Sequence, residues 1–154
     1  MRKLIITLAV AIVLFRWAGI AHAKGLIIKP EPDEAFVEIS ALTKEVNLGT
    51  TKIQGLHVLD SAVTVRVKSN CLHGSIFAST TGLNRTPYGF IPPERISLKS
   101  PVTNGFIPMD NDVMISKPVF GDHDITLSFR VQTSVEDPEG IYTGTLILTL
   151  MPPS

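Results

Sequence analysis

The chain has 154 residues, a single cysteine and 14 basic residues against 14 acidic ones, so its formal net charge at pH 7 is zero. That balance excludes the strong electrostatic attraction by which basic proteins bind nucleic acid or anionic lipid. One cysteine excludes an internal disulfide and any zinc site built from several thiolates.

The first 23 residues have the composition of a secretory signal peptide. Arg2 and Lys3 form a basic start, Leu4–Leu14 is an apolar run containing one Thr, and the segment ends on the small-x-small pattern Ala21-His22-Ala23. The apolar run is followed closely by Arg16. It is shorter than the roughly 20 residues that a membrane-spanning helix needs. The sequence therefore predicts a signal helix that is cleaved after Ala23.

Cleavage would leave residues 24–154 as the mature chain, which is 154 less 23, or 131 residues. Three basic residues leave with the leader, so 11 basic residues remain against 14 acidic ones and the net charge becomes −3. The length suits one domain with one hydrophobic core. We expect a bacterial protein of the periplasm, cell surface or extracellular space, with no membrane span in the mature chain and no nucleic-acid partner.

Strand patterns dominate the mature chain. Alternation of apolar and polar residues, which marks a half-buried strand, is clearest in Ala62–Lys68, Ile125–Gln132 and Tyr142–Leu150. Short turn sequences separate the strands, and no stretch shows a helical period. The pattern predicts an all-β sandwich of about seven to nine strands in one domain. Weaker strand candidates are Leu26–Lys29, Ala35–Ala41, Glu45–Leu48, Ser75–Thr80, Arg95–Lys99 and Val113–Ser116.

Two parts of the mature chain carry recognisable motifs. Asn47–Thr50 precedes the alternating segment Ala62–Cys71, and the C-terminal segment Asp137–Leu150 contains a Gly-x-Tyr-x-Gly-x-Leu pattern. These segments resemble exported bacterial immunoglobulin-like domains of the pilin and spore-coat-U kind. The resemblance implies an immunoglobulin-like Greek-key β-sandwich that assembles as a surface subunit. The chain departs from chaperone–usher pilins because it lacks their early disulfide and ends in Met151–Ser154 instead of an aromatic tail.

Gly140 and Tyr142 follow an Asp-Pro turn at the start of the last predicted strand. This spacing is typical of a tyrosine corner, in which the phenol hydroxyl bonds to a backbone group near the turn and holds a connection between sheets. The alternative is that Tyr142 only covers the end of the core. Both interpretations give Gly140 and Tyr142 a structural role.

Cys71 and His73 are the best candidates for a nucleophile and its base, because alternate residues of a strand share a face. Such side chains lie roughly 6 to 7 Å apart, too far for direct proton transfer. A packed thiol and a surface imidazole are the favoured interpretation. The sequence contains no nucleophile elbow, phosphate-binding loop or zinc motif. We therefore predict no catalytic residue, no cofactor and no enzymatic activity.

Two acidic pairs are weak candidates for calcium binding: Asp110 with Asp112, and Asp122 with Asp124. Calcium takes six to eight oxygen ligands, and neither pair continues into an EF-hand loop. Aspartate also favours turns through its own backbone hydrogen bonds. Plain turns are therefore the favoured interpretation, and no metal is predicted.

The leading functional hypothesis is a non-enzymatic structural or interaction domain, a pilus-like or surface subunit. Its partner would be another protein or a second copy, bound by pairing between sheet edges. The nominated donor strand is the N-terminal segment in which Ala35, Val37, Ile39 and Ala41 alternate with Phe36, Glu38 and Ser40. The alternative for that segment is an ordinary first strand of its own domain.

The second hypothesis is a secreted ligand-binding module of the carbohydrate type. Tyr88 and Phe90 could form part of its binding face, since exposed aromatic residues mark interaction sites. They could equally cap the core beneath the Pro-rich middle of the chain, and this capping role is the favoured interpretation. The only tryptophan, Trp17, would leave with the leader, which counts against an indole platform for sugars.

Overall fold

The structure is a computed structural model that describes residues 6–11, 35–43 and 54–151, and it shows an all-β protein. The described ranges contain twelve strands, eleven of them after the predicted leader, where seven to nine were predicted. Four of the twelve are only two residues long, too short to leave a periodic pattern in the sequence. The predicted strands Leu26–Lys29 and Glu45–Leu48 lie outside the described residues. The elements are β1 (Ile6–Ala11), β2 (Val37–Ala41), β3 (Gly55–Ser69), β4 (Leu72–His73), β5 (Ile76–Asn84), β6 (Phe90–Ile91), the 3₁₀ turn η1 (Pro93–Arg95), β7 (Ile96–Lys99), β8 (Ile107–Pro108), β9 (Val113–Ser116), β10 (Val119–Phe120), β11 (His123–Thr133) and β12 (Tyr142–Leu150).

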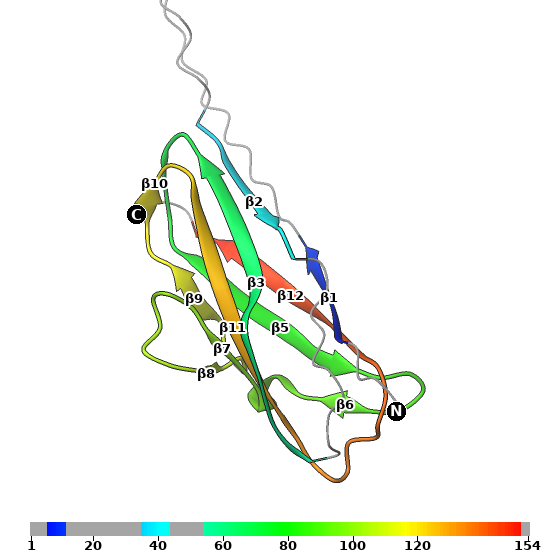
Figure 1. Cartoon of the computed structure of the whole chain (residues 1–154). Helices are drawn as coiled ribbons and strands as arrows, with labels where there is room; N and C mark the ends of the chain where they lie inside the picture. The colour runs from blue at the N-terminus through cyan, green and yellow to red at the C-terminus, as the bar shows by residue number, and fades with distance from the viewer. Residues whose placement is uncertain (1–5, 12–34, 44–53, 152–154) are drawn as a thin grey trace, which may run out of the picture.

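Two five-stranded sheets form two layers, as expected of a β-sandwich (Figure 1). The β12 sheet has the order β1-β12-β5-β6, and β9 also pairs with β5. The β11 sheet has the order β2-β3-β11-β7-β8. A separate two-stranded pair joins β4 to β10. All described pairings are antiparallel except that of β1 with β12.

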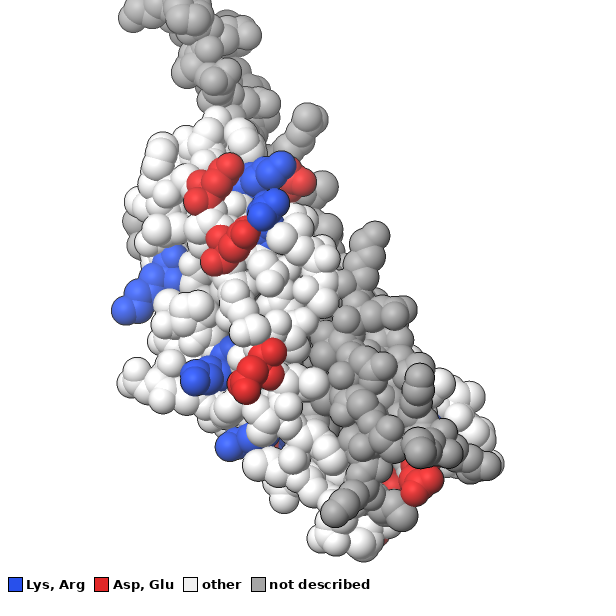
Figure 2. All heavy atoms as spheres, viewed as in Figure 1, with Lys and Arg blue, Asp and Glu red and all other residues white. Residues whose placement is uncertain are grey.

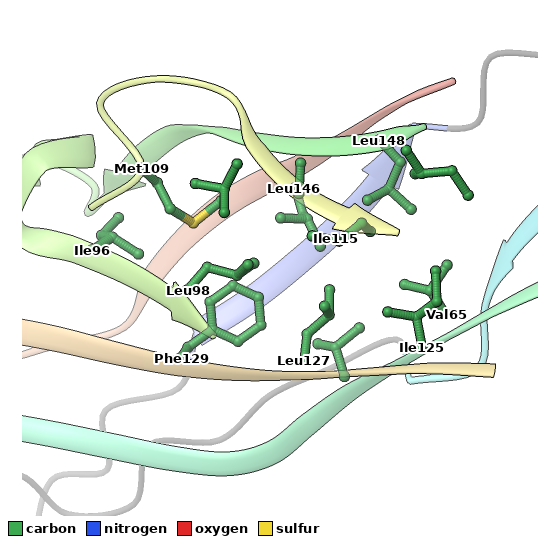
Figure 3. Packing of buried hydrophobic residues seen from close by; sticks show 14 of the residues in the cluster. Val65, Ile96, Leu98, Met109, Ile115, Ile125, Leu127, Phe129, Leu146 and Leu148 are labelled. Carbon is green, nitrogen blue, oxygen red and sulfur yellow. The ribbon is translucent and has the colours of Figure 1, made fainter. Parts of the chain in front are cut away.

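The core lies between the two sheets, where inward-facing side chains meet (Figure 3). Leu127 and Phe129 of the β11 sheet point toward Leu146 and Leu148 of the β12 sheet. The alternation predicted for the three strongest strands is confirmed, because most apolar positions of the predicted inward face are buried and most intervening positions are not. Burial of each large aliphatic side chain contributes about 1.5–3 kcal/mol, and no disulfide closes the described part of the fold.

The N-terminal segment differs from the prediction of a signal helix, because Ile6–Ala11 forms the strand β1. This run is rich in β-branched and aliphatic residues, which suit a strand as well as an apolar helix. It lies beside β12, whose other side is already paired with β5 (Figure 1). The backbone groups that β12 offers to a neighbour explain why the segment is extended here.

Candidate functional site: the outer edge of β12

The outer edge of β12, the side that faces away from β5, is the candidate interaction site. Its described partner is β1, which pairs in parallel from Ile6 opposite Tyr142 to Ala11 opposite Ile147. On the other side β12 pairs with β5 along nearly its whole length. Residues 1–23 carry the predicted leader, so β1 belongs to the part of the chain that cleavage would remove.

The sequence of β12 does nothing to block pairing with another chain. Tyr142–Leu150 contains no charged residue and no proline. Natural edge strands are usually short, charged, bulged or interrupted by proline, because unpaired backbone groups are a template for association. The edges of the β11 sheet follow this rule: β2 carries the exposed Glu38, and β8 is two residues long and contains Pro108. Among the described strands, β12 is thus a long strand with an unprotected outer side.

Tyr142 fixes the start of this edge. Its ring is 2% exposed and its hydroxyl donates a hydrogen bond to the carbonyl of Pro138 at 2.9 Å. This is the bond that a tyrosine corner requires. Burial raises the pKa of the phenol, so the neutral donor is favoured. Gly140 has φ +157° and packs directly against the Arg85 side chain, where a Cβ would collide.

Tyr88 and Phe90 lie near the same end of β12, around the tip that follows β5. Tyr88 is 78% exposed and Phe90 is 51% exposed, so neither is enclosed by the core as the favoured interpretation expected. The Arg85 guanidinium donates to the Tyr88 carbonyl at 2.8 Å and holds the loop. The Phe90 ring rests on Gly82, where a Cβ would lie 2.7 Å from it. These two aromatic residues therefore widen the apolar surface at this end of the molecule.

The segment nominated as a donor strand is paired within its own domain. Val37–Ala41 forms β2, antiparallel to β3, with Ile39 buried and Ala35 exposed just before the strand. This is the alternative interpretation, an ordinary first strand. A strand that is already paired in this way is not available to a neighbour unless the fold opens, so we do not assign the donor role to it.

The acidic calcium candidates have other roles in the structure. Asp124 accepts two hydrogen bonds from Arg66, both 2.9 Å long, and this contact lowers the pKa of the Asp124 carboxyl. Asp122 accepts the backbone N–H of Ser69 at 2.9 Å. Asp110 and Asp112 are exposed in the turn before β9. In residues 6–11, 35–43 and 54–151, no three His, Cys, Asp or Glu residues are grouped to hold a metal ion.

The charged surface is mixed in sign. Figure 2 shows basic and acidic side chains interspersed on the face drawn, among mostly uncharged residues. Such a surface gives no long-range steering toward a polyanion or polycation. No helix within the described ranges is long and apolar enough to cross a membrane.

His73 is not the surface imidazole that was predicted, because it is 1% exposed. Pairing of β4 with β10 carries it inward, and its ring stacks on that of His123 with centroids 5.1 Å apart. His73 Nδ1 lies 2.6 Å from the Gly74 carbonyl, which assigns the proton to Nδ1. The half-buried Cys71 directs its sulfur to the Phe36 carbonyl at 3.6 Å. These contacts give the two residues separate packing roles instead of a nucleophile–base pair.

A hollow on the outer face of the β11 sheet was not predicted from the sequence. It is open to solvent and has a volume of about 590 Å³, and we call it the Arg130 hollow. Near it, His57 Nε2 lies 3.0 Å from the Thr133 hydroxyl, which itself donates to the Gly55 carbonyl, so His57 acts as the donor. Partial burial lowers the pKa of His57 and favours its neutral form. The residues that line the hollow are Gln54, Gly55, Leu56, Glu94, Arg95, Ser97, Pro108, Arg130, Gln132 and Thr133.

No protein-family model matches this chain, and the curated proteins include no relative of significant sequence similarity. The fold and the β12 edge therefore define only a general class, an all-β sandwich-like protein with one long unprotected strand. Function has to be argued from the sites themselves.

Proposed function

We propose that this protein is an exported, non-enzymatic structural subunit that assembles with other chains by strand pairing at the outer edge of β12. In this proposal the domain is an immunoglobulin-like Greek-key sandwich of a pilus-like or cell-surface kind. It acts in the periplasm, at the cell surface or outside the cell. The observation that carries the proposal is the parallel pairing of β1 with β12 through six residue pairs.

Removal of the leader would take this partner away from β12. The backbone groups of Tyr142–Ile147 that face β1 would then bond only to water. Each backbone hydrogen bond regained by a new strand contributes about 0.5–1.5 kcal/mol. Several such bonds along a six-residue strand would therefore contribute substantially to the free energy of association. A strand from another chain is the partner that matches this geometry, since main-chain bonds give affinity and alternate side chains give specificity.

Contacts within its own domain also hold β12 in place. The Tyr142 hydroxyl bonds to the Pro138 carbonyl at the start of the strand. Further along, the side chains of Leu146 and Leu148 are buried in the core. A pre-ordered edge avoids much of the entropy that a flexible segment would lose on binding. Its uncharged outer threonines leave the approach open, which supports β12 as the acceptor.

Two lysines on the exposed side of β12 are expected to abolish assembly. Thr143→Lys with Thr145→Lys places charge where a new strand would pair, which is how natural edges prevent association. The matched control, Thr126→Lys with Gln132→Lys, adds the same charge to β11, an inner strand of the other sheet. Sedimentation velocity of residues 24–154 should show loss of oligomers in the first variant only. Equal oligomer content in both variants would refute the assignment to β12.

A second candidate function, a secreted carbohydrate-type binding module, is supported by a different feature, the Arg130 hollow. That candidate does not compete for the β12 edge, because the hollow lies on the other sheet.

A further inference from the structure

Arg130 is held in a fixed position at the Arg130 hollow. It lies on β11 between Val58 of β3 and Ser97 of β7, and its guanidinium carbon is 5.0 Å from the centre of the Phe106 ring. This cation–π contact orients the planar group while leaving its N–H donors free to bond at their edges. Among the described residues, the ion pairs join Arg66 to Asp124 and Arg95 to Asp137, so none neutralises Arg130.

The other charges of the hollow indicate what kind of anion fits. Arg95 is already bound, since its guanidinium contacts Asp137 at 2.5 Å and the Ser134 hydroxyl at 3.3 Å. Glu94 is exposed and lines the same hollow. One free guanidinium beside one carboxylate suits a ligand group that carries a single negative charge, whereas a phosphate dianion would meet stronger repulsion from Glu94. A carboxylate can also accept two parallel hydrogen bonds from one guanidinium.

The neutral lining completes the recognition surface. The Gln54 and Gln132 side chains each offer both donors and acceptors, which suits hydroxyl groups that also act as both. Leu56 and Pro108 add apolar area beside them, which suits the C–H face of a sugar ring. The volume of about 590 Å³ falls within the roughly 300–1,000 Å³ of small-ligand sites.

A peptide fits this place less well. At Arg130 and Ser97 the strands β11 and β7 are paired on both sides, so their backbone cannot accept an added strand. Recognition must therefore come from side chains alone. We infer that the Arg130 hollow binds a carboxylate-bearing saccharide, with the uronate group on Arg130. This inference does not depend on assembly through β12.

The test is titration calorimetry of the protein expressed from its full-length sequence against a panel of short uronate oligomers: galacturonate, guluronate, mannuronate and glucuronate. Fully methyl-esterified galacturonate oligomers keep the rings and remove the charge, so they are the matched neutral ligand. We expect at least one acid oligomer to bind and its esterified or neutral counterpart to bind at least tenfold more weakly. Arg130→Gln should weaken the acid oligomer at least tenfold, because charge-assisted hydrogen bonds are lost.

Two further variants separate binding from folding. Arg66→Gln removes an arginine from the exposed face of the same sheet, away from the hollow lining, and should leave affinity unchanged. Gln132→Ala should weaken binding severalfold without altering the charge of the hollow. It provides the test of the hollow if Arg130→Gln fails to fold. Absence of binding by every acid oligomer, or equal affinity for acid and neutral forms, would overturn the inference. Tighter binding of a glutamate hexapeptide than of any saccharide would also overturn it and assign the hollow to acidic peptides.

Discussion

Gly144→Ala is expected to destabilise the protein by about 3 kcal/mol, because β12 and β5 are too close at this position for a side chain. A Cβ at Gly144 would lie 2.5 Å from the Gly82 carbonyl oxygen and 2.7 Å from a Leu83 methyl carbon. The first of these atoms belongs to the backbone and cannot move without breaking the β12–β5 pairing. Urea denaturation followed by far-ultraviolet circular dichroism measures the loss.

Gly105→Ala is the matched control for this prediction. No heavy atom lies within 4 Å of a Cβ built at Gly105. Its free energy of unfolding should therefore stay within about 0.5 kcal/mol of the parent protein, as for most surface changes. Similar stabilities of the two alanine variants would contradict the packing of β12 against β5 described above.

Tyr142→Ala is expected to cost about 3–5 kcal/mol, the range for removing a buried aromatic side chain. The ring is 2% exposed, so the change opens a cavity where β12 begins. Tyr142→Phe keeps the ring and removes the hydrogen bond to Pro138, and should cost about 1–3 kcal/mol. Urea denaturation of both variants gives their free energies of unfolding. The loss in Tyr142→Phe measures the contribution of the hydrogen bond, and the further loss in Tyr142→Ala measures the contribution of ring packing.

The same substitutions at Tyr88 provide the comparison, because that side chain is 78% exposed. Tyr88→Ala and Tyr88→Phe should each change stability by about 0.5 kcal/mol or less. If Tyr142→Phe were as stable as the parent protein, the hydrogen bond to Pro138 would not anchor the start of β12.

Much of the fold was predictable from local alternation. Tyr142–Leu150 was predicted with the bounds that β12 has, and Ile125–Gln132 falls inside β11. The start of β3 was missed because its apolar residues Leu56 and Val58 face outward, which reverses the usual relation between hydrophobicity and burial. No local sequence pattern predicts that apolar residues will face outward here, because the facing depends on how the strand pairs within the sheet.

The sites were less predictable than the strands. Tyr142 and Gly140 were found because their spacing is local and tied to one turn. The burial of His73 depends on β10, which lies 46 residues further along the chain and is too short to predict. The Arg130 hollow draws on segments from Gln54 to Thr133, and only the register between β3, β11 and β7 brings them together.

Recognising the β12 edge required both the sequence and the arrangement of the strands in the sheet. Its lack of charge and proline is visible in the sequence, but its position at the side of a sheet is not. The structure shows β1 of the same chain paired along this edge, and cleavage of the predicted leader would leave the edge vacant.

The most direct test of assembly through β12 is the mass in solution of residues 24–154, measured by size-exclusion chromatography with light scattering in a reducing buffer. The reducing buffer removes any disulfide between Cys71 residues of different chains, so the species that remain are non-covalent. We predict a species of at least twice the monomer mass, whose share grows with protein concentration. A monomer at every concentration would contradict the proposal, because it would mean that the β12 edge stays closed without β1.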